Sequence, residues 1–131
     1  MKLLIWVISE IILVFLILTS PIDISNQTSN WFDGLPIDKM IHILLFGSLS
    51  LSIFAYFQYS NILELKTIRA KALALIFCIL YGIGMEYYQK YFVPSRSFDV
   101  IDMLADAMGA LLALPFFNMV KHYIQPKLKS I

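Results

Sequence analysis

Charged side chains able to bind a ligand or a metal ion crowd around one short loop of this chain. The stretch from Glu86 to Asp106 leaves one apolar segment, crosses a loop with Arg96, and enters the next apolar segment still carrying Asp99 and Asp102. Ionisable side chains within a membrane segment are costly, and they usually face a protein interior or a watery cavity. If these segments cross a membrane, this stretch is a candidate functional site.

A second polar group opens an earlier apolar segment, where Asp38, Lys39 and His42 stand close together. Residues three, four or seven apart on a helix share a face. The spacings that place polar residues on common faces are Asp38 with His42, Glu86 with Gln89, and Asp99 with Asp102 and Asp106. Three helices would then each present one polar face.

These side chains suit two kinds of binding. Imidazole and carboxylate groups offer the nitrogen and oxygen ligands that divalent metal ions accept. The candidate metal ligands are His42, Glu86, Asp102 and Asp106. Their spacing matches no recognised metal motif, so the sequence assigns no cofactor. Alternatively, Lys39 and Arg96 could hold a phosphate while the acids hold ammonium groups.

The same residues also have a purely structural interpretation. Asp38 and Asp99 are predicted to cap their helices, where a carboxylate accepts backbone N–H bonds. Lys39 and Arg96 could neutralise neighbouring acids, which would make the cluster a structural network of ion pairs. Four acids nevertheless outnumber these two cations, namely Glu86, Asp99, Asp102 and Asp106. Protonation, a bound cation or a cationic ligand group is needed to balance them.

The composition places the apolar segments in a membrane. Of the 131 residues, 60% are hydrophobic and 15% are charged, and the mean hydropathy is +0.77, far from the balance of a soluble domain. The expected fold is all-α: a polytopic integral membrane protein with four transmembrane helices in a compact bundle, forming a single domain over 1–131. The expected helices run at about 3–20, 40–57, 72–92 and 98–120.

Basic residues set the expected orientation of these helices. Seven of the ten basic residues fall on one predicted side of the membrane, namely Lys2, Lys66, Arg69, Lys71, Lys121, Lys127 and Lys129. The positive-inside bias therefore predicts that both termini are cytoplasmic. The polar faces of the second, third and fourth helices then converge at the outer leaflet.

Several other residues bear on packing. Glu10 interrupts the first apolar run, so it must be protonated or paired with another helix, and it argues against a cleaved signal peptide, which is the rival interpretation. Cys78 is predicted to pack as a small hydrophobe. Small residues four apart predict a face for close helix packing, namely Ala105, Gly109 and Ala113. The polar stretch 21–36 is predicted to be a loop.

The polar motifs resemble those of the VanZ-like family of small bacterial membrane proteins. They read Asp38-Lys39-x-x-His42, then Phe46 and Leu49, then Glu86-x-x-Gln89, then Arg96-x-x-Asp99-x-x-Asp102-x-x-x-Asp106-x-x-Gly109. The resemblance covers roughly 38–113 and leaves the first helix outside, and Asp106 stands where the family commonly has asparagine. It implies a protein of the bacterial cytoplasmic membrane. The family takes its name from a member associated with resistance to teicoplanin-type glycopeptides, so the resemblance also implies a link to such resistance.

Three functions of different classes remain open. The first is a binding module whose outer cluster holds the head of a cell-envelope lipid, such as a cell-wall lipid precursor, or an amphipathic, amine-bearing antibiotic. The second is a structural or assembly protein whose cluster fixes helix register. The third is a metal-assisted intramembrane lipid hydrolase, with His42 or Glu86 as general base and a metal held by Asp102 and Asp106.

The enzyme ranks last of the three. Ser95 and Ser97 are the nearest hydroxyl nucleophiles, and they stand in the loop with no base at helical spacing. Hydrolysis would therefore have to run through activated water. Besides the lipid bilayer, the partners that these hypotheses imply are a cell-wall lipid precursor or an amphipathic antibiotic. Nothing in the sequence indicates nucleic-acid binding or an oligomeric state.

Overall fold

Four α-helices make up the described part of the chain, as the hydropathy pattern predicts. The computed structural model describes residues 1–21, 36–60, 67–94 and 96–129. Its helices are α1 (Lys2–Leu18), α2 (Ile37–Tyr59), α3 (Thr67–Phe92) and α4 (Val100–Lys129), and no strand occurs within those ranges. Helices form here because a segment in lipid must satisfy its backbone polar groups internally.

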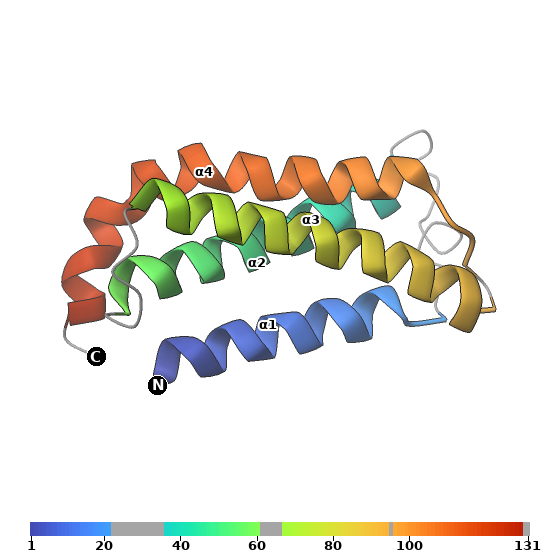
Figure 1. The fold of residues 1–131 in the computed structure, drawn as a ribbon, viewed down its shortest axis with the longest axis horizontal. Coiled ribbons are helices and arrows are strands. Elements are labelled where there is room, and N and C mark those ends of the chain that lie inside the picture. The colour runs from blue at the N-terminus through green and yellow to red at the C-terminus, as the bar shows by residue number, and fades with distance from the viewer. Residues whose placement is uncertain (22–35, 61–66, 95, 130–131) are drawn as a thin grey trace.

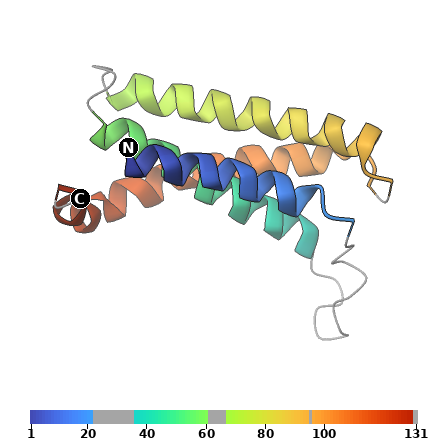
Figure 2. The ribbon, with the colours of Figure 1, turned by 90° about the horizontal axis from the view of Figure 1, so that it is seen from below.

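The helices alternate in direction along one long axis (Figure 1). The end of α1, the start of α2, the end of α3 and the start of α4 lie at one end of the bundle, and the start of α1 and the end of α4 lie at the other. α2 packs against all three other helices, most extensively against α4. Figure 2 shows α1 running beside α2. This alternation brings the polar residues of three helices to the same end.

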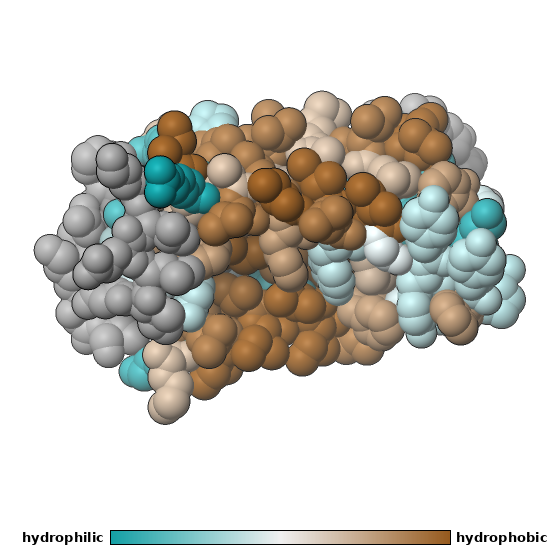
Figure 3. Space-filling view, viewed as in Figure 1, coloured by the Kyte–Doolittle hydropathy of each residue, from teal (hydrophilic) through white to brown (hydrophobic). Residues whose placement is uncertain are grey.

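Three of the described helices are long and apolar enough to cross a membrane, over Ile37–Tyr59, Ile68–Phe92 and Val100–Val120. α1 has 17 residues, a length of about 26 Å, which is shorter than a hydrocarbon core of about 30 Å. A fourth span and the cytoplasmic placement of the termini therefore stay predictions. Figure 3 shows hydrophobic residues across the middle of the bundle surface, where lipid is the expected surrounding.

Helix ends differ from the predicted ones most clearly in the second half of the chain. α3 begins at Thr67 rather than near residue 72, and α4 continues to Lys129 rather than ending near residue 120. Hydropathy marks where a helix leaves lipid, but a helix continues wherever the residues favour it, as lysine and arginine do. The predicted loop 21–36 lies outside the described residues except at its two ends.

Small residues let α2 and α4 approach closely in the middle of the bundle. A Cβ atom on Gly109 would overlap the backbone carbonyl of Ile43, and one on Gly47 would lie 3.4 Å from the Gly109 carbonyl oxygen. Ala105 and Ala113 are buried on the same face of α4. The predicted small-residue packing face is therefore confirmed.

The rest of this contact is neutral and well packed. Ser50 Oγ donates a hydrogen bond to the Ala110 carbonyl oxygen across the two helices at 3.2 Å. Nearer the far end, the rings of Phe54 and Phe117 meet edge to face with centroids 5.8 Å apart. Cys78 is buried among apolar residues, as predicted. We call the mid-bundle contact the glycine seam, made of Ile43, Gly47 and Ser50 of α2 with Gly109 and Ala110 of α4.

Candidate functional site

Ionisable side chains from α2, α3, α4 and the α3–α4 connection meet at the end of the bundle away from the start of α1 (Figure 1). They form two layers. The outer layer, called the rim, consists of Asp38, Lys39, Arg96, Asp99 and Asp102. The deeper layer, called the inner triad, consists of His42, Glu86 and Asp106.

Both cations of the rim are engaged by acids. Lys39 Nζ lies 2.6 Å from Asp99 Oδ2 and 3.8 Å from Asp38 Oδ2, and it also pairs with Asp102 Oδ1. Arg96 Nη1 donates to Asp38 Oδ1 at 3.0 Å. The Asp102 side chain is nearly buried, whereas the other four rim side chains keep between 15% and 35% of their surface exposed. Three rim carboxylates therefore share two cations.

The inner triad is shut away from solvent beneath the rim. Its side chains are at most 1% exposed. His42 Nδ1 lies 2.7 Å from Asp106 Oδ1, and an ionised carboxylate there would accept a hydrogen bond from the ring. Glu86 Oε2 accepts a hydrogen bond of 3.0 Å from the Asp99 backbone N–H. Each member of the triad comes from a different helix: His42 from α2, Glu86 from α3 and Asp106 from α4.

Three polar atoms of the inner triad have no hydrogen-bond partner within the described residues: His42 Nε2, Glu86 Oε1 and Asp106 Oδ2. Buried polar atoms are rarely left unpaired, because each one costs the free energy of removing it from water. Asp102 Oδ2 lies 4.0 Å from His42 Nε2, beyond hydrogen-bonding distance. The triad therefore has unused capacity to bind something.

The structure places the four predicted metal candidates, together with Asp38, in two groups that share His42. Asp38, His42 and Asp102 form one group, and His42, Glu86 and Asp106 form the other. Within each group the ligand atoms lie within 4.8 Å of one another. The first group is partly exposed and includes two acids that already contact Lys39 or Arg96. The second group is the inner triad.

The predicted helix caps have different outcomes. Asp99 Oδ1 accepts a hydrogen bond of 2.8 Å from the Ile101 backbone N–H at the start of α4, so its capping role is confirmed. The hydrogen bond from Lys39 holds the pKa of the Asp99 carboxyl below its usual value. The capping prediction for Asp38 is wrong, because α2 begins at Ile37 with Pro36 as its N-cap. Asp38 therefore lies within the first turn, where it accepts a hydrogen bond from Arg96 instead.

Two residues near the triad behave in ways that spacing does not indicate. Gln89 shares a face with Glu86, yet its Nε2 donates to the Leu18 carbonyl oxygen at the end of α1, at 2.8 Å. Gly82 lies beside the triad, and a Cβ atom there would stand 2.7 Å from Asp106 Oδ2. A glycine in an apolar run carries no sequence signal for such a role.

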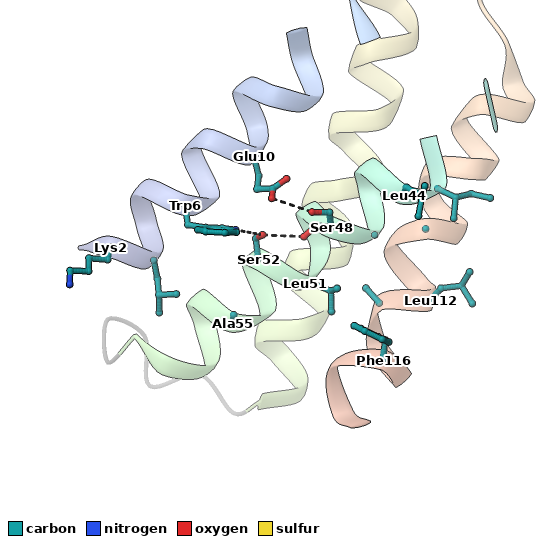
Figure 4. Close-up of a pocket in the computed structure, with 15 residues that line it drawn as sticks. Lys2, Trp6, Glu10, Leu44, Ser48, Leu51, Ser52, Ala55, Leu112 and Phe116 are labelled. Carbon is teal, nitrogen blue, oxygen red and sulfur yellow. Dashed lines mark hydrogen bonds between the residues drawn. The ribbon is translucent and has the colours of Figure 1, made fainter. Parts of the chain in front are cut away.

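A hollow lies along the side of the bundle, between α1 and α4, with α2 as its floor (Figure 4). Its volume is about 900 Å³ and its walls are mostly apolar. Figure 4 shows Glu10 directed toward Ser48, which donates to Glu10 Oε1 at 3.1 Å, and Trp6 directed toward Ser52, the acceptor of its indole N–H at 3.0 Å. The predicted pairing of Glu10 with another helix is confirmed.

Comparisons with known proteins give one family and one relative. A family model described as VanZ/LLP1 matches residues 3–121, which includes the first helix that the motif resemblance left outside. An uncharacterized protein of the fission yeast Schizosaccharomyces pombe is 33% identical over 86 residues, which cover 65% of this chain and 48% of the yeast protein. The chain thus spans about half the length of that relative. No solved structure matches.

Proposed function

Because the chain belongs to the VanZ/LLP1 family of membrane proteins, we propose that it binds the polar head of a cell-envelope lipid, or of an amphipathic molecule with a similar head, at the rim. The bacterial cytoplasmic membrane is the proposed location. An amine-bearing glycopeptide of the teicoplanin type is a second ligand of the same chemistry. The observation that carries the proposal is the partial exposure of charges of both signs at the end of the membrane spans.

The rim charges suit a head that carries both a phosphate and an ammonium group. Arg96 can donate two parallel hydrogen bonds to a phosphate, and Lys39 adds a second positive charge. Asp38 and Asp99 accept hydrogen bonds from an ammonium group. The surplus of one carboxylate in the rim favours a head with a positive group over a purely anionic one.

Rim side chains that pair with each other can separate and pair with a ligand head instead. Partly exposed ion pairs contribute about 0–1 kcal/mol, because water competes well for both partners. Arg96 and Asp38 form such a pair, with side chains 15% and 32% exposed. Their separation by a ligand head therefore costs little.

The level of the rim in the bilayer supports the same ligand class. Tyr87, Tyr88 and Tyr91 lie near the end of α3 and are 49%, 37% and 67% exposed. Tyrosine rings are enriched where lipid tails meet head groups. These rings support a position of the rim at the level of the lipid heads.

The test is the thermal stability of the purified full chain in detergent, with short-chain phosphatidylethanolamine, phosphatidylglycerol or diacylglycerol added. A ligand at a hundredfold excess over Kd stabilises the folded state by about 2.7 kcal/mol. We expect phosphatidylethanolamine to raise the melting temperature most and diacylglycerol to leave it unchanged. Arg96→Gln and Asp99→Asn should abolish the shift.

Lys90→Gln is the matched control, because it removes a positive charge at the same end of the bundle. Lys90 Nζ lies over the rings of Tyr91 and Phe98, outside the rim, so the lipid shift should persist. No shift with any lipid, together with much lower melting of both rim variants, would make the cluster a structural network. Release of the lipid head during incubation would instead identify a hydrolase.

A further inference from the structure

We propose that the inner triad binds a divalent metal ion, held by a ring nitrogen of His42 and one carboxylate oxygen each from Glu86 and Asp106. The site lies beneath the rim and requires nothing of the rim's ligand. It therefore goes beyond the proposed function, and each of the two can fail without the other.

Distance is the first argument. The three ligand atoms lie within 4.8 Å of one another and come from three different helices. Zinc binds nitrogen and oxygen ligands at about 2.0–2.2 Å, and larger ions bind oxygen at up to about 2.6 Å. Two ligands of one ion are therefore at most about 4–5 Å apart, so a single ion can reach all three with small side-chain movements.

Unused ligand capacity is the second and independent argument. His42 Nε2, Glu86 Oε1 and Asp106 Oδ2 have no hydrogen-bond partner in the described part of the chain, and all three side chains are at least 99% buried. A structural network of ion pairs would be expected to satisfy such atoms. A bound cation would take one ligand atom from each of the three residues.

Charge balance points to a cation rather than a neutral ligand. Glu86 and Asp106 are two buried carboxylates, and the basic side chains of the rim, Lys39 and Arg96, pair with rim acids. His42 by itself could balance one of the two carboxylates when protonated. A divalent ion balances both and takes the imidazole in its neutral form.

The other candidate group is a weaker site on the same grounds. Asp38 and Asp102 also lie near His42, but Arg96 holds the first and Lys39 holds the second. A divalent ion placed there would be repelled by the Lys39 ammonium group. The inner triad faces no such competing cation among the described residues.

Gly82 offers a test that leaves every ligand in place. The Asp106 carboxylate occupies the space next to Gly82 where any other residue would carry a Cβ atom, 2.7 Å from Oδ2. Gly82→Ala should therefore push the carboxylate away from its position and weaken metal binding. Gly84 lies two residues on in α3, and a Cβ atom there would meet nothing within 4 Å, so Gly84→Ala is the matched control.

The experiment uses the full chain purified in detergent, stripped with a chelator and then titrated with Zn²⁺, Mn²⁺ or Mg²⁺ by calorimetry, with bound metal counted by elemental analysis. We expect one ion per chain. Glu86→Gln and Asp106→Asn should each weaken binding more than about tenfold, Gly82→Ala about tenfold, and Gly84→Ala not measurably.

Two results would overturn the proposal. One is a folded wild-type chain that binds none of the three ions. The other is metal binding that stays at wild-type strength in Gly82→Ala and in the carboxylate variants that fold. If neither carboxylate variant folds, the comparison of Gly82→Ala with Gly84→Ala decides. Repeating the lipid titration of the rim in the presence of the chelator separates a failure of this site from a failure of head-group binding.

Discussion

α2 and α4 meet in two places that are held by different physics. At the glycine seam their backbones approach so closely that Gly109 leaves no space for a side chain, and every group there is neutral. At the polar end, carboxylates, a lysine and an imidazole fill the space between the same two helices. One contact is neutral and close, and the other is charged, with some atoms that lack a hydrogen-bond partner among the described residues.

This difference suggests that the glycine seam serves helix association, whereas the polar end serves ligand binding. Membrane helices associate through close packing of small residues, which needs no charge. Buried ion pairs add little net stability, because the cost of removing two charges from water offsets their attraction. We therefore expect the seam to contribute more than the polar end to holding α2 against α4. Within the described residues, the polar end has buried atoms without a hydrogen-bond partner, which a purely structural contact would not need.

The largest effect is expected at the seam. Gly109→Ala places a Cβ atom against the backbone carbonyl of Ile43, which cannot move aside as a flexible side chain would. We expect the free energy of unfolding to fall by about 3 kcal/mol, measured by denaturant or SDS unfolding in detergent. Gly47→Ala meets its neighbour at 3.4 Å and should cost less than about 1 kcal/mol. Equal costs for the two would show that the close approach contributes nothing.

The next effect is expected at the polar end. Lys39→Met removes the cation shared by Asp99 and Asp102. Since Lys39 is partly exposed, the free energy of unfolding should fall by about 2 kcal/mol, less than for a fully buried pair.

A double variant sharpens this result. Lys39→Met combined with Asp102→Leu replaces a nearly buried pair by apolar groups, and it should recover most of the loss. If the double variant is no more stable than Lys39→Met alone, then the charge left unpaired at Asp102 is not the cause of the loss.

The smallest effect is expected from the hydrogen bond that crosses the seam. Ser50→Ala removes the donor to the Ala110 carbonyl oxygen. Interhelical hydrogen bonds in membrane proteins contribute about 0.6 kcal/mol on average, so we expect a loss of that size in the same unfolding assay. Ser9→Ala is the control, since the hydrogen bond that Ser9 Oγ donates among the described residues goes to the Trp6 carbonyl oxygen on its own helix. A loss larger than that of Gly109→Ala would reverse the ranking of the two forces.

Much of the fold and part of the candidate site follow from the order of residues. Four apolar runs predict four helices, since lipid leaves the backbone no other way to satisfy its polar groups. Residues spaced three and four apart fall on one face whatever the helix packs against, which is why Asp102 and Asp106 both turn toward α2. Alternating helix directions then bring the polar ends of α2, α3 and α4 together.

The hydrogen-bond and ion-pair partner of each polar side chain does not follow from the order of residues in the sequence. Asp38 and Asp99 had the same predicted role as caps, but only Asp99 caps its helix, while Asp38 pairs with Arg96, 58 residues away. Gln89 turns from its neighbour Glu86 to the end of α1. Each outcome depends on how far a helix is rotated about its axis, and apolar contacts elsewhere in the bundle set that rotation.

By itself the sequence determined a helical membrane protein with a group of acids, a histidine and two cations at one end. The tertiary structure decided that both cations pair with rim acids and that the inner triad, beside Gly82, has atoms with no hydrogen-bond partner among the described residues. The reason is physical. Hydropathy and helical period act along a single segment, whereas charge pairing and close approach depend on three segments packed at once.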